Sequence, residues 1–230
     1  MHHMTRVRRD DAGVTLIELL LAIVLLGIIA VPLGGALISF FRNTNATTDR
    51  LAESHDAQIA SAYFGQDVAN IGVRTWNLPS GPYTLGTSVE TNAPPKSGTF
   101  PCGPVGDPNA VIRMAWDDPT GASTLRKVIV SYVVRQVGTE KQLHRLRCDD
   151  GTSNPTSDLV LAHNVQSVGT PVLTGPVAGV PQSVSVTLTL KAPTDAGSLA
   201  ITLFGQRRQT SGSGSGSASR PCAATRTGRR

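Results

Sequence analysis

The sequence predicts an α+β fold, in which a long N-terminal helix is packed on a mostly antiparallel β-sheet head. Three observations indicate this fold. An apolar run from Val14 to Phe41 carries a single charged side chain, Glu18. Residues 183–192 alternate apolar with polar side chains, which is the period of a strand with one buried face. Charged residues make up 16% and aromatic residues 4% of a chain with 23 Gly and 15 Pro, which favours a loop-rich β domain.

The apolar run is long enough to cross a membrane. A helix over residues 14–41 would rise about 42 Å at roughly 1.5 Å per residue, more than the ~30 Å hydrocarbon core of a bilayer. Arg6, Arg8 and Arg9 precede the run, and only Arg42 follows it closely. By the positive-inside rule, we expect a single-pass protein with its N-terminus in the cytoplasm and its head outside.

Two ordinary kinds of apolar N-terminal segment leave part of this pattern unexplained. A secretory signal peptide has its small-residue cleavage site after the apolar core, whereas Ala12 and Gly13 precede it here. An uncleaved signal anchor accounts for the length and the arginines. It does not account for Glu18, because an ionised carboxylate in hydrocarbon costs roughly 3 kcal/mol.

The N-terminus resembles a known family. A short basic leader ends at Gly13 and is followed by Val14-Thr15-Leu16-Ile17-Glu18 and an unbroken apolar run. This order resembles the N-terminus of type IV prepilins and of the pseudopilins of type II secretion. The resemblance implies that a prepilin peptidase cuts between Gly13 and Val14 and methylates the new N-terminal amine. Thr15, Leu16, Ile17 and Glu18 would then serve assembly, with Glu18 pairing with the amine of a neighbouring subunit.

The resemblance also implies partners and a location. A bacterial subunit of this kind is first inserted in the inner membrane as a single-pass protein and then joins an extracytoplasmic filament. Its partners would be other pilin or pseudopilin subunits, the prepilin peptidase and the inner-membrane assembly platform. The alternative is a membrane-anchored extracytoplasmic β domain that binds a ligand and is not assembled into a filament.

The apolar helix departs from the family pattern in two ways. The first mature residue would be Val14, where phenylalanine is commonest. Pro32 comes a few residues earlier than the proline of many pilins, and Gly34 and Gly35 follow it. Because proline removes a helix hydrogen bond and clashes with the preceding turn, we expect a kink or a locally melted turn at residues 32–35.

The sequence divides into five predicted segments. They are a cleaved cytoplasmic leader (1–13), a transmembrane and filament-core helix (14–41), an amphipathic helix continuation (42–72), an extracytoplasmic β-rich head (73–208) and a disordered Ser/Gly/Arg tail (209–230). The cluster NTNATT at 43–48 indicates a weak spot or loop, after which Leu51, His55, Ile59 and Ala62/Tyr63 recur at helical spacing.

Within the head, alternation predicts antiparallel strands, and residues 77–109 look irregular. The predicted strands cover 110–116, 125–134, 143–148, 158–168, 183–192 and 198–208. A second, shorter resemblance points to the J-type minor pseudopilin. It is carried by YFGQDVANIG with Asp67, and by the hairpin that has Tyr132 before its turn and Leu143 and Arg145 after it.

Three cysteines lie on the predicted outer side, where disulfides form. Cys102 and Cys148 both fall in the head and are the predicted pair. Cys222 follows the SGSGSGS run, and it either pairs with Cys148 instead or stays free.

The sequence favours no catalytic, cofactor or metal site. The catalytic and nucleotide-binding motifs HExxH, GxSxG, GxGxxG and Walker A are absent, and the cysteines lack zinc-site spacing with histidines. The net charge of +5 arises largely near the two ends of the chain. We therefore expect no nucleic-acid binding by the head, unless the filament is one that takes up DNA.

Overall fold

The computed structural model describes residues 15–75, 84–118, 126–175, 179–191 and 198–208. The predicted leader, Val14 and the predicted tail lie outside the described residues. The chain forms two compact units, which divide between Arg50 and Leu51.

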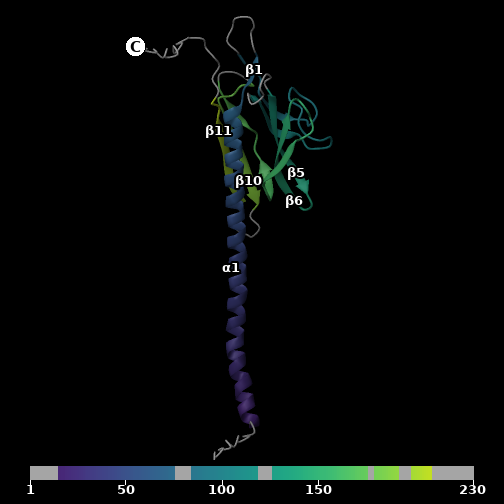
Figure 1. Ribbon diagram of the computed structural model, residues 1–230. Coiled ribbons are helices and arrows are strands. Elements are labelled where there is room, and N and C mark those ends of the chain that lie inside the picture. The colour runs from purple at the N-terminus through teal and green to yellow at the C-terminus, as the bar shows by residue number, and fades with distance from the viewer. Residues whose placement is uncertain (1–14, 76–83, 119–125, 176–178, 192–197, 209–230) are drawn as a thin grey trace, which may run out of the picture. The chain divides into compact units, whose positions relative to one another are not determined.

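Helix α1 (Leu16–Asn70) is one element of 55 residues (Figure 1). The predicted loop at 43–48 is wrong, because this segment is helical. The hydroxyl groups of its threonines explain why this segment remains helical. The Oγ1 atoms of Thr44, Thr47 and Thr48 donate to the carbonyl oxygens four residues earlier, at 2.9, 2.9 and 3.0 Å. This local bonding lets threonine stay in a helix that it would otherwise disfavour.

The second part of α1, from Leu51, belongs to the compact unit that holds the strands. Ala60, Phe64 and Val68 are fully buried at a spacing of four residues, so they form the face that packs on the sheets. The predicted apolar face began at Leu51 and His55, but both side chains are exposed. The amphipathic pattern therefore starts about two turns later than expected.

The larger sheet has five strands in the order β3-β4-β5-β6-β7, and every pair of neighbours is antiparallel. Its strands are β3 (Val89–Ala93), β4 (Ala110–Asp118), β5 (Arg126–Val137), β6 (Glu140–Asp149) and β7 (Ser157–Ala162). The predicted β-rich head is confirmed, and the predicted strands 110–116 and 143–148 lie inside β4 and β6. Gly138, at φ 61°, turns the β5–β6 hairpin, because this backbone region favours glycine.

The second sheet follows the order β11-β10-β8, with β9 pairing the other end of β10, and its pairs are also antiparallel. Its strands are β8 (Val165–Val168), β9 (Val172–Thr174), β10 (Ser183–Lys191) and β11 (Ser198–Gln206). The single strand predicted over 158–168 is wrong. It is two strands in two different sheets, separated by a turn at Asn164, which has φ 51°.

Two short strands lie near the end of α1. They are β1 (Val73–Thr75) and β2 (Thr84–Gly86), paired antiparallel. Gly72 forms a parallel bridge to Trp116, which connects this ribbon to β4. Strands β2 and β3 both fall in the segment 77–109 that was expected to be irregular, so that expectation is only partly right.

The larger sheet separates two apolar cores. The inner core lies between the two sheets and α1, and its members include Phe64, Met114, Tyr132 and Leu188. The outer core lies on the opposite face of the larger sheet, because Ala115, Ile129 and Val133 alternate with inner-core residues along β4 and β5. Phe100 and Cys102 from the segment between β3 and β4 complete it.

Candidate functional site

The N-terminal start of α1 carries the predicted assembly residues. Thr15 precedes the first helical residue, and its carbonyl oxygen accepts hydrogen bonds from the backbone N–H groups of Glu18 (3.0 Å) and Leu19 (3.2 Å). Glu18 is exposed in the first turn, where a carboxylate is favoured by the helix dipole. Leu16 and Ile17 are 81% and 68% exposed. Gly13 and Val14, the predicted processing residues, lie outside the described residues.

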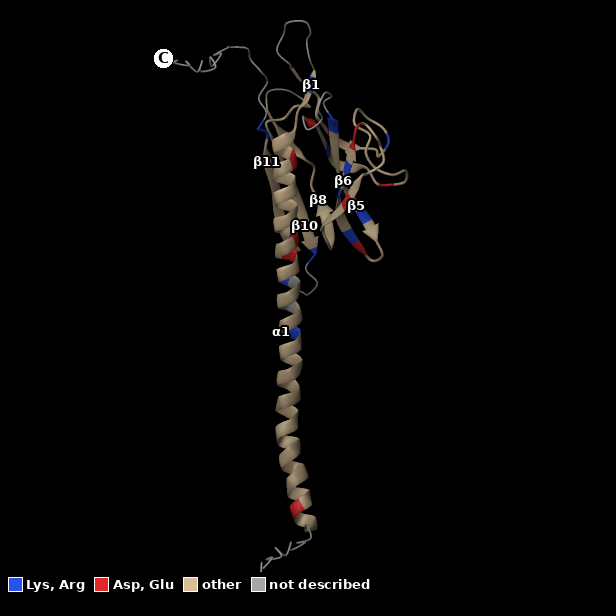
Figure 2. Cartoon of the chain, in the orientation of Figure 1, with Lys and Arg blue, Asp and Glu red and all other residues tan. Residues whose placement is uncertain are grey.

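The first part of α1 presents apolar side chains on every side. All residues from Leu16 to Phe41 are exposed, and α1 is long and apolar enough to cross a membrane by length and composition. Figure 2 shows that, beyond the acidic residue in its first turn, Glu18, this long stretch of α1 carries no charged side chain. A soluble monomer rarely exposes so large an apolar surface, so lipid or other protein chains must cover it.

The expected kink region is helical throughout. Pro32, Gly34 and Gly35 all lie within the continuous helix, so the prediction of a melted turn is wrong. A hydrogen-bond break at one proline can be absorbed when the helix on both sides is strong. A bend at Pro32 stays a prediction. A Cβ atom on Gly34 or Gly35 would meet nothing within 4 Å, so packing within this chain does not require these glycines.

In the head, a buried polar cluster joins α1 to the larger sheet. Asp67 is 2% exposed and accepts a hydrogen bond from the hydroxyl of Tyr132 at 2.6 Å. Arg145 donates to both carboxylate oxygens of Asp67, through Nε and Nη2, at 2.7 Å each. The guanidinium carbon of Arg145 also lies 5.1 Å from the ring centre of Tyr63. Three of the four residues named in the J-type resemblance, Asp67, Tyr132 and Arg145, thus meet in one cluster, without Leu143.

Electrostatics keep the Tyr132 hydroxyl and the Arg145 guanidinium protonated. Burial, together with the negative charge of Asp67, raises the pKa of Tyr132 well above its ordinary value, so its hydroxyl stays a donor. Burial alone would lower the pKa of Arg145. The hydrogen bonds and the charge of Asp67 outweigh burial and raise that pKa above its ordinary value. The cluster is therefore a fixed ion pair with a phenol donor.

A cavity of about 400 Å³ lies beside this cluster. The end of α1 contributes Gln66, Asp67 and Asn70 to its lining. The strands contribute the rest of the lining: Arg74, Trp116, Asp117, Asp118, Arg145 and Arg147. The cavity is thus polar, and four elements of the head build it.

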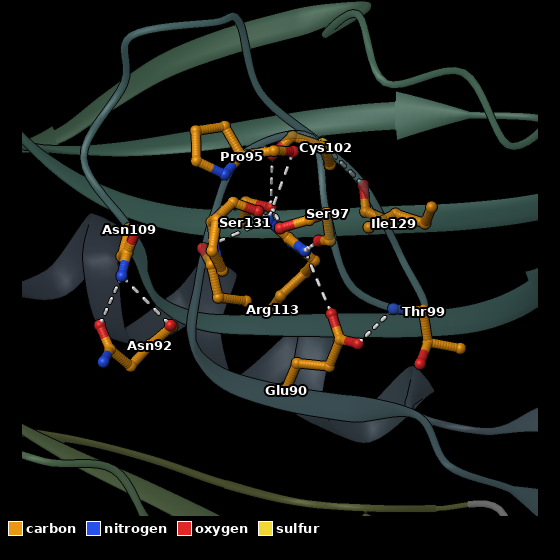
Figure 3. A network of polar contacts seen from close by, with 12 residues as sticks. Glu90, Asn92, Pro95, Ser97, Thr99, Cys102, Asn109, Arg113, Ile129 and Ser131 are labelled. Atoms are coloured by element: carbon orange, nitrogen blue, oxygen red, sulfur yellow. Dashed lines mark hydrogen bonds and ion pairs between the residues drawn. The ribbon is translucent and has the colours of Figure 1, made fainter.

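The opposite face of the larger sheet carries a second buried network, drawn in Figure 3. Arg113 is fully buried, and its guanidinium donates to Glu90 (3.1 Å), to Ser131 (3.1 Å) and to the carbonyl oxygens of Ser97 (3.0 Å) and Pro94 (2.7 Å). Burial lowers the pKa of Arg113, and the charge of Glu90 offsets part of this effect. The arginine therefore holds the segment after β3 onto the sheet.

The predicted cysteine pair lies in the same region. Cys102 and Cys148 are joined by a disulfide that connects this segment to β6. The hydroxyl of Ser131 donates to the carbonyl oxygen of Cys102 at 3.1 Å, so the arginine network and the disulfide hold neighbouring points of the segment. Cys222 lies outside the described residues.

Comparison with known proteins gives one finding. A family model described as the prokaryotic N-terminal methylation motif matches residues 8–34. No curated protein is similar enough to the chain to count as a match. The chain therefore carries a prepilin-type methylation motif, consistent with the type IV pilin and pseudopilin family.

Sequence reasoning missed the cavity and the role of Arg113. Alternation along β4 places Arg113 opposite Ile112 and Met114, which is also the pattern of a solvent-facing residue. Arg113 is buried because the segment between β3 and β4 lies over it, and no local sequence pattern predicts where that segment lies. Asp67 and Arg145 are the lining residues that the sequence singled out, through the J-type resemblance, and the other lining residues carried no such signal.

Proposed function

We propose that this chain is a pilin-like structural subunit. It is made as a membrane-inserted precursor, cut by a prepilin peptidase between Gly13 and Val14, and assembled through α1 into a type II secretion pseudopilus or a type IV pilus. The observation that carries this proposal is the methylation motif at residues 8–34, which overlaps the start of α1, where every residue from Leu16 to Phe41 is exposed.

Glu18 has a specific role in this proposal. Cleavage creates a positive amine at Val14, four residues before the carboxylate. In a filament, the carboxylate of one subunit pairs with the amine of a neighbour, and this attraction offsets the cost of burying both charges. Apolar helices slide easily past one another, so one such pair fixes their register.

We further propose that the subunit is a minor, J-type component near the tip of the filament. The support is the cluster of Asp67, Tyr132 and Arg145, whose residues carry the short J-type resemblance and contact one another. The work of this subunit is structural rather than enzymatic. The inner-membrane assembly platform is its partner before export, and other pilin-like subunits are its partners afterwards.

The first test is the mass and N-terminal sequence of the protein extracted from the membranes of its own host. We expect a chain that begins at Val14 and carries one added methyl group. The variant Gly13→Leu should keep the leader. A chain that keeps its original start in cells with an active prepilin peptidase would overturn the proposal, and the anchored binding module would take its place.

The second test separates processing from assembly. Glu18→Gln removes the charge and keeps the size of the side chain, while Glu18→Asp keeps the charge. We expect both variants to be inserted and cleaved. Only the aspartate variant should be found in filaments that are sheared from cells or trapped by cross-linking. An equal amount of the glutamine variant in that fraction would count against the pairing role.

A further inference from the structure

The cavity at the end of α1 has the size and position of a ligand site. Its volume of about 400 Å³ falls within the usual range for small-molecule pockets, roughly 300–1,000 Å³. All its lining residues belong to the unit from Leu51 onward, so the head builds it without the membrane-spanning part of α1. Nothing in the proposed assembly through α1 requires this cavity.

The formal charges of the lining cancel. Three arginines face the cavity from β1 and β6, and three aspartates face it from α1 and β4. An anionic ligand would meet the three carboxylates and a cationic ligand the three guanidinium groups. The cavity therefore favours a ligand that is polar and carries no net charge.

The orientation of α1 strengthens this argument against an anion. Phosphate and carboxylate ligands commonly bind at the positive N-terminal end of a helix. The C-terminal end of α1 lies at this cavity, because α1 ends at Asn70, which is one of the lining residues. The C-terminal end of a helix carries partial negative charge, which repels an anion.

The floor of the cavity is rigid and its rim is adaptable. Asp67 and Arg145 hold each other through two hydrogen bonds, and the backbone N–H of Arg74 donates to Asp117 at 2.5 Å. Gln66 is exposed at the rim, and Arg147 is partly exposed. Amide and guanidinium groups are planar and offer neighbouring donors or acceptors, which match pairs of adjacent hydroxyl groups. Trp116 adds an aromatic ring to the lining.

From this combination we propose that the cavity binds an uncharged oligosaccharide. Adjacent hydroxyl groups of a sugar ring supply both donors and acceptors, as the mixed lining demands. Trp116 contributes to the lining, but at 7% exposed it packs mainly into the inner core, so the polar groups carry the recognition. The site is a function of the head separate from assembly, so its test leaves the assembly proposal untouched.

The test uses the full-length protein in a polyoxyethylene detergent, which has no sugar headgroup. Maltotriose, cellotriose and triacetylchitotriose, all uncharged, are titrated by calorimetry, with inorganic phosphate and a mixed-charge tetrapeptide as the competing ligand classes. We expect at least one trisaccharide to bind with a Kd of about 1 mM or tighter, and phosphate not to bind.

Variants locate the binding. Gln66→Ala and Arg147→Gln change the rim, and each should weaken trisaccharide binding by about tenfold or more. Arg126→Gln is the matched control, because Arg126 also pairs with Asp149 but does not line the cavity. Near-ultraviolet circular dichroism checks that each variant is folded. The proposal fails if no trisaccharide binds, if only phosphate or the peptide binds, or if the rim variants bind as the control does.

Discussion

Asp67 and Arg145 form a two-pronged ion pair across the head, with both donor–acceptor distances at 2.7 Å, although 78 residues separate them. Asp67 lies near the end of α1 and Arg145 lies on β6. Both are almost fully buried. The pair fixes the rotation of the last turns of α1 against the larger sheet, because neither charge has water as an alternative partner.

Asp67→Asn should destabilise the head strongly. The change leaves the charge of Arg145 buried without its counter-charge, which costs about 3–5 kcal/mol of unfolding free energy. Tyr132→Phe is the milder comparison, since it removes one hydrogen bond and keeps the ring that packs on Phe64, and we expect a cost of about 1–2 kcal/mol. Chemical denaturation of the detergent-solubilised protein measures both. A smaller loss for Asp67→Asn than for Tyr132→Phe would contradict this account.

Arg113→Lys should loosen the segment between β3 and β4. Lysine has no planar fork of donors, so several of the oxygens that Arg113 binds would be left buried without a partner. We expect a loss of about 2–4 kcal/mol and faster proteolysis within residues 94–109. Arg126→Lys is the control, because its side chain is 43% exposed and should tolerate the change. Equal proteolysis of the two variants would refute the role of Arg113.

Removal of the disulfide should act on the same segment. The double variant Cys102→Ser, Cys148→Ser frees the segment from β6, and the loop-entropy model gives a cost of about 2–4 kcal/mol. Cys222→Ser should leave the unfolding free energy unchanged. Peptide mapping of the native protein under non-reducing conditions identifies which cysteines are joined. A bridge between Cys148 and Cys222 would contradict the Cys102–Cys148 pairing.

Two glycines near the junction of α1 and β11 should respond in opposite ways. A Cβ atom on Gly205 would lie 2.5 Å from the Cβ atom of Val68, so Gly205→Ala should cost about 1–3 kcal/mol through overpacking. A Cβ atom on Gly65 would meet the carbonyl oxygen of Phe204 at an ordinary 3.6 Å. Gly65→Ala should therefore be neutral, or stabilising by about 0.5–1 kcal/mol through helix propensity. Thermal unfolding of the two variants compares them directly.

Asp149 should make stability depend on acid pH. Burial alone would raise its pKa, but hydrogen bonds from Thr156 and Arg147 hold that pKa below its ordinary value. A carboxyl group whose pKa is lower in the folded protein than in the unfolded chain stabilises the fold at pH values above the unfolded pKa of about 3.9. This stabilisation is lost as the pH falls through the folded pKa. Asp149→Asn should thus be less stable than the native protein at pH 7, and the difference should shrink below about pH 4.

The control for this titration is Asp150→Asn. Asp150 is 60% exposed at its side chain and has φ 56°, a conformation that asparagine also adopts. Its unfolding free energy at pH 7 should lie within about 1 kcal/mol of the native value, because its ion pair with Arg126 is exposed. Urea titrations at several pH values measure all three proteins, and a constant gap between Asp149→Asn and the native protein down to low pH would contradict the prediction.

Much of this fold is local enough to be predicted from the sequence. Strict alternation predicts β10 and looser alternation predicts β11, each to within two residues at its end, and the first part of α1 follows from its apolar composition. The split of residues 158–168 between two sheets is not local, since β7 and β8 follow closely in the chain and only the turn at Asn164 separates them. Asp67, Tyr132 and Arg145 were identified through a resemblance, but their contact depends on the packing of α1 against β5 and β6.

The inner core joins the first and the last elements of the head, α1 and β11. Phe64 and Val68 on α1 share it with Leu188 on β10 and Leu203 on β11. A ribosome adds roughly 5–20 residues per second, so on the order of ten seconds separate the synthesis of Phe64 from that of Leu203. During that interval the second sheet is incomplete, so the part of α1 that this sheet covers has no strands packed on it. The head can close only when its last strand arrives, and until then a newly made chain depends on other surfaces to shield this part of the helix.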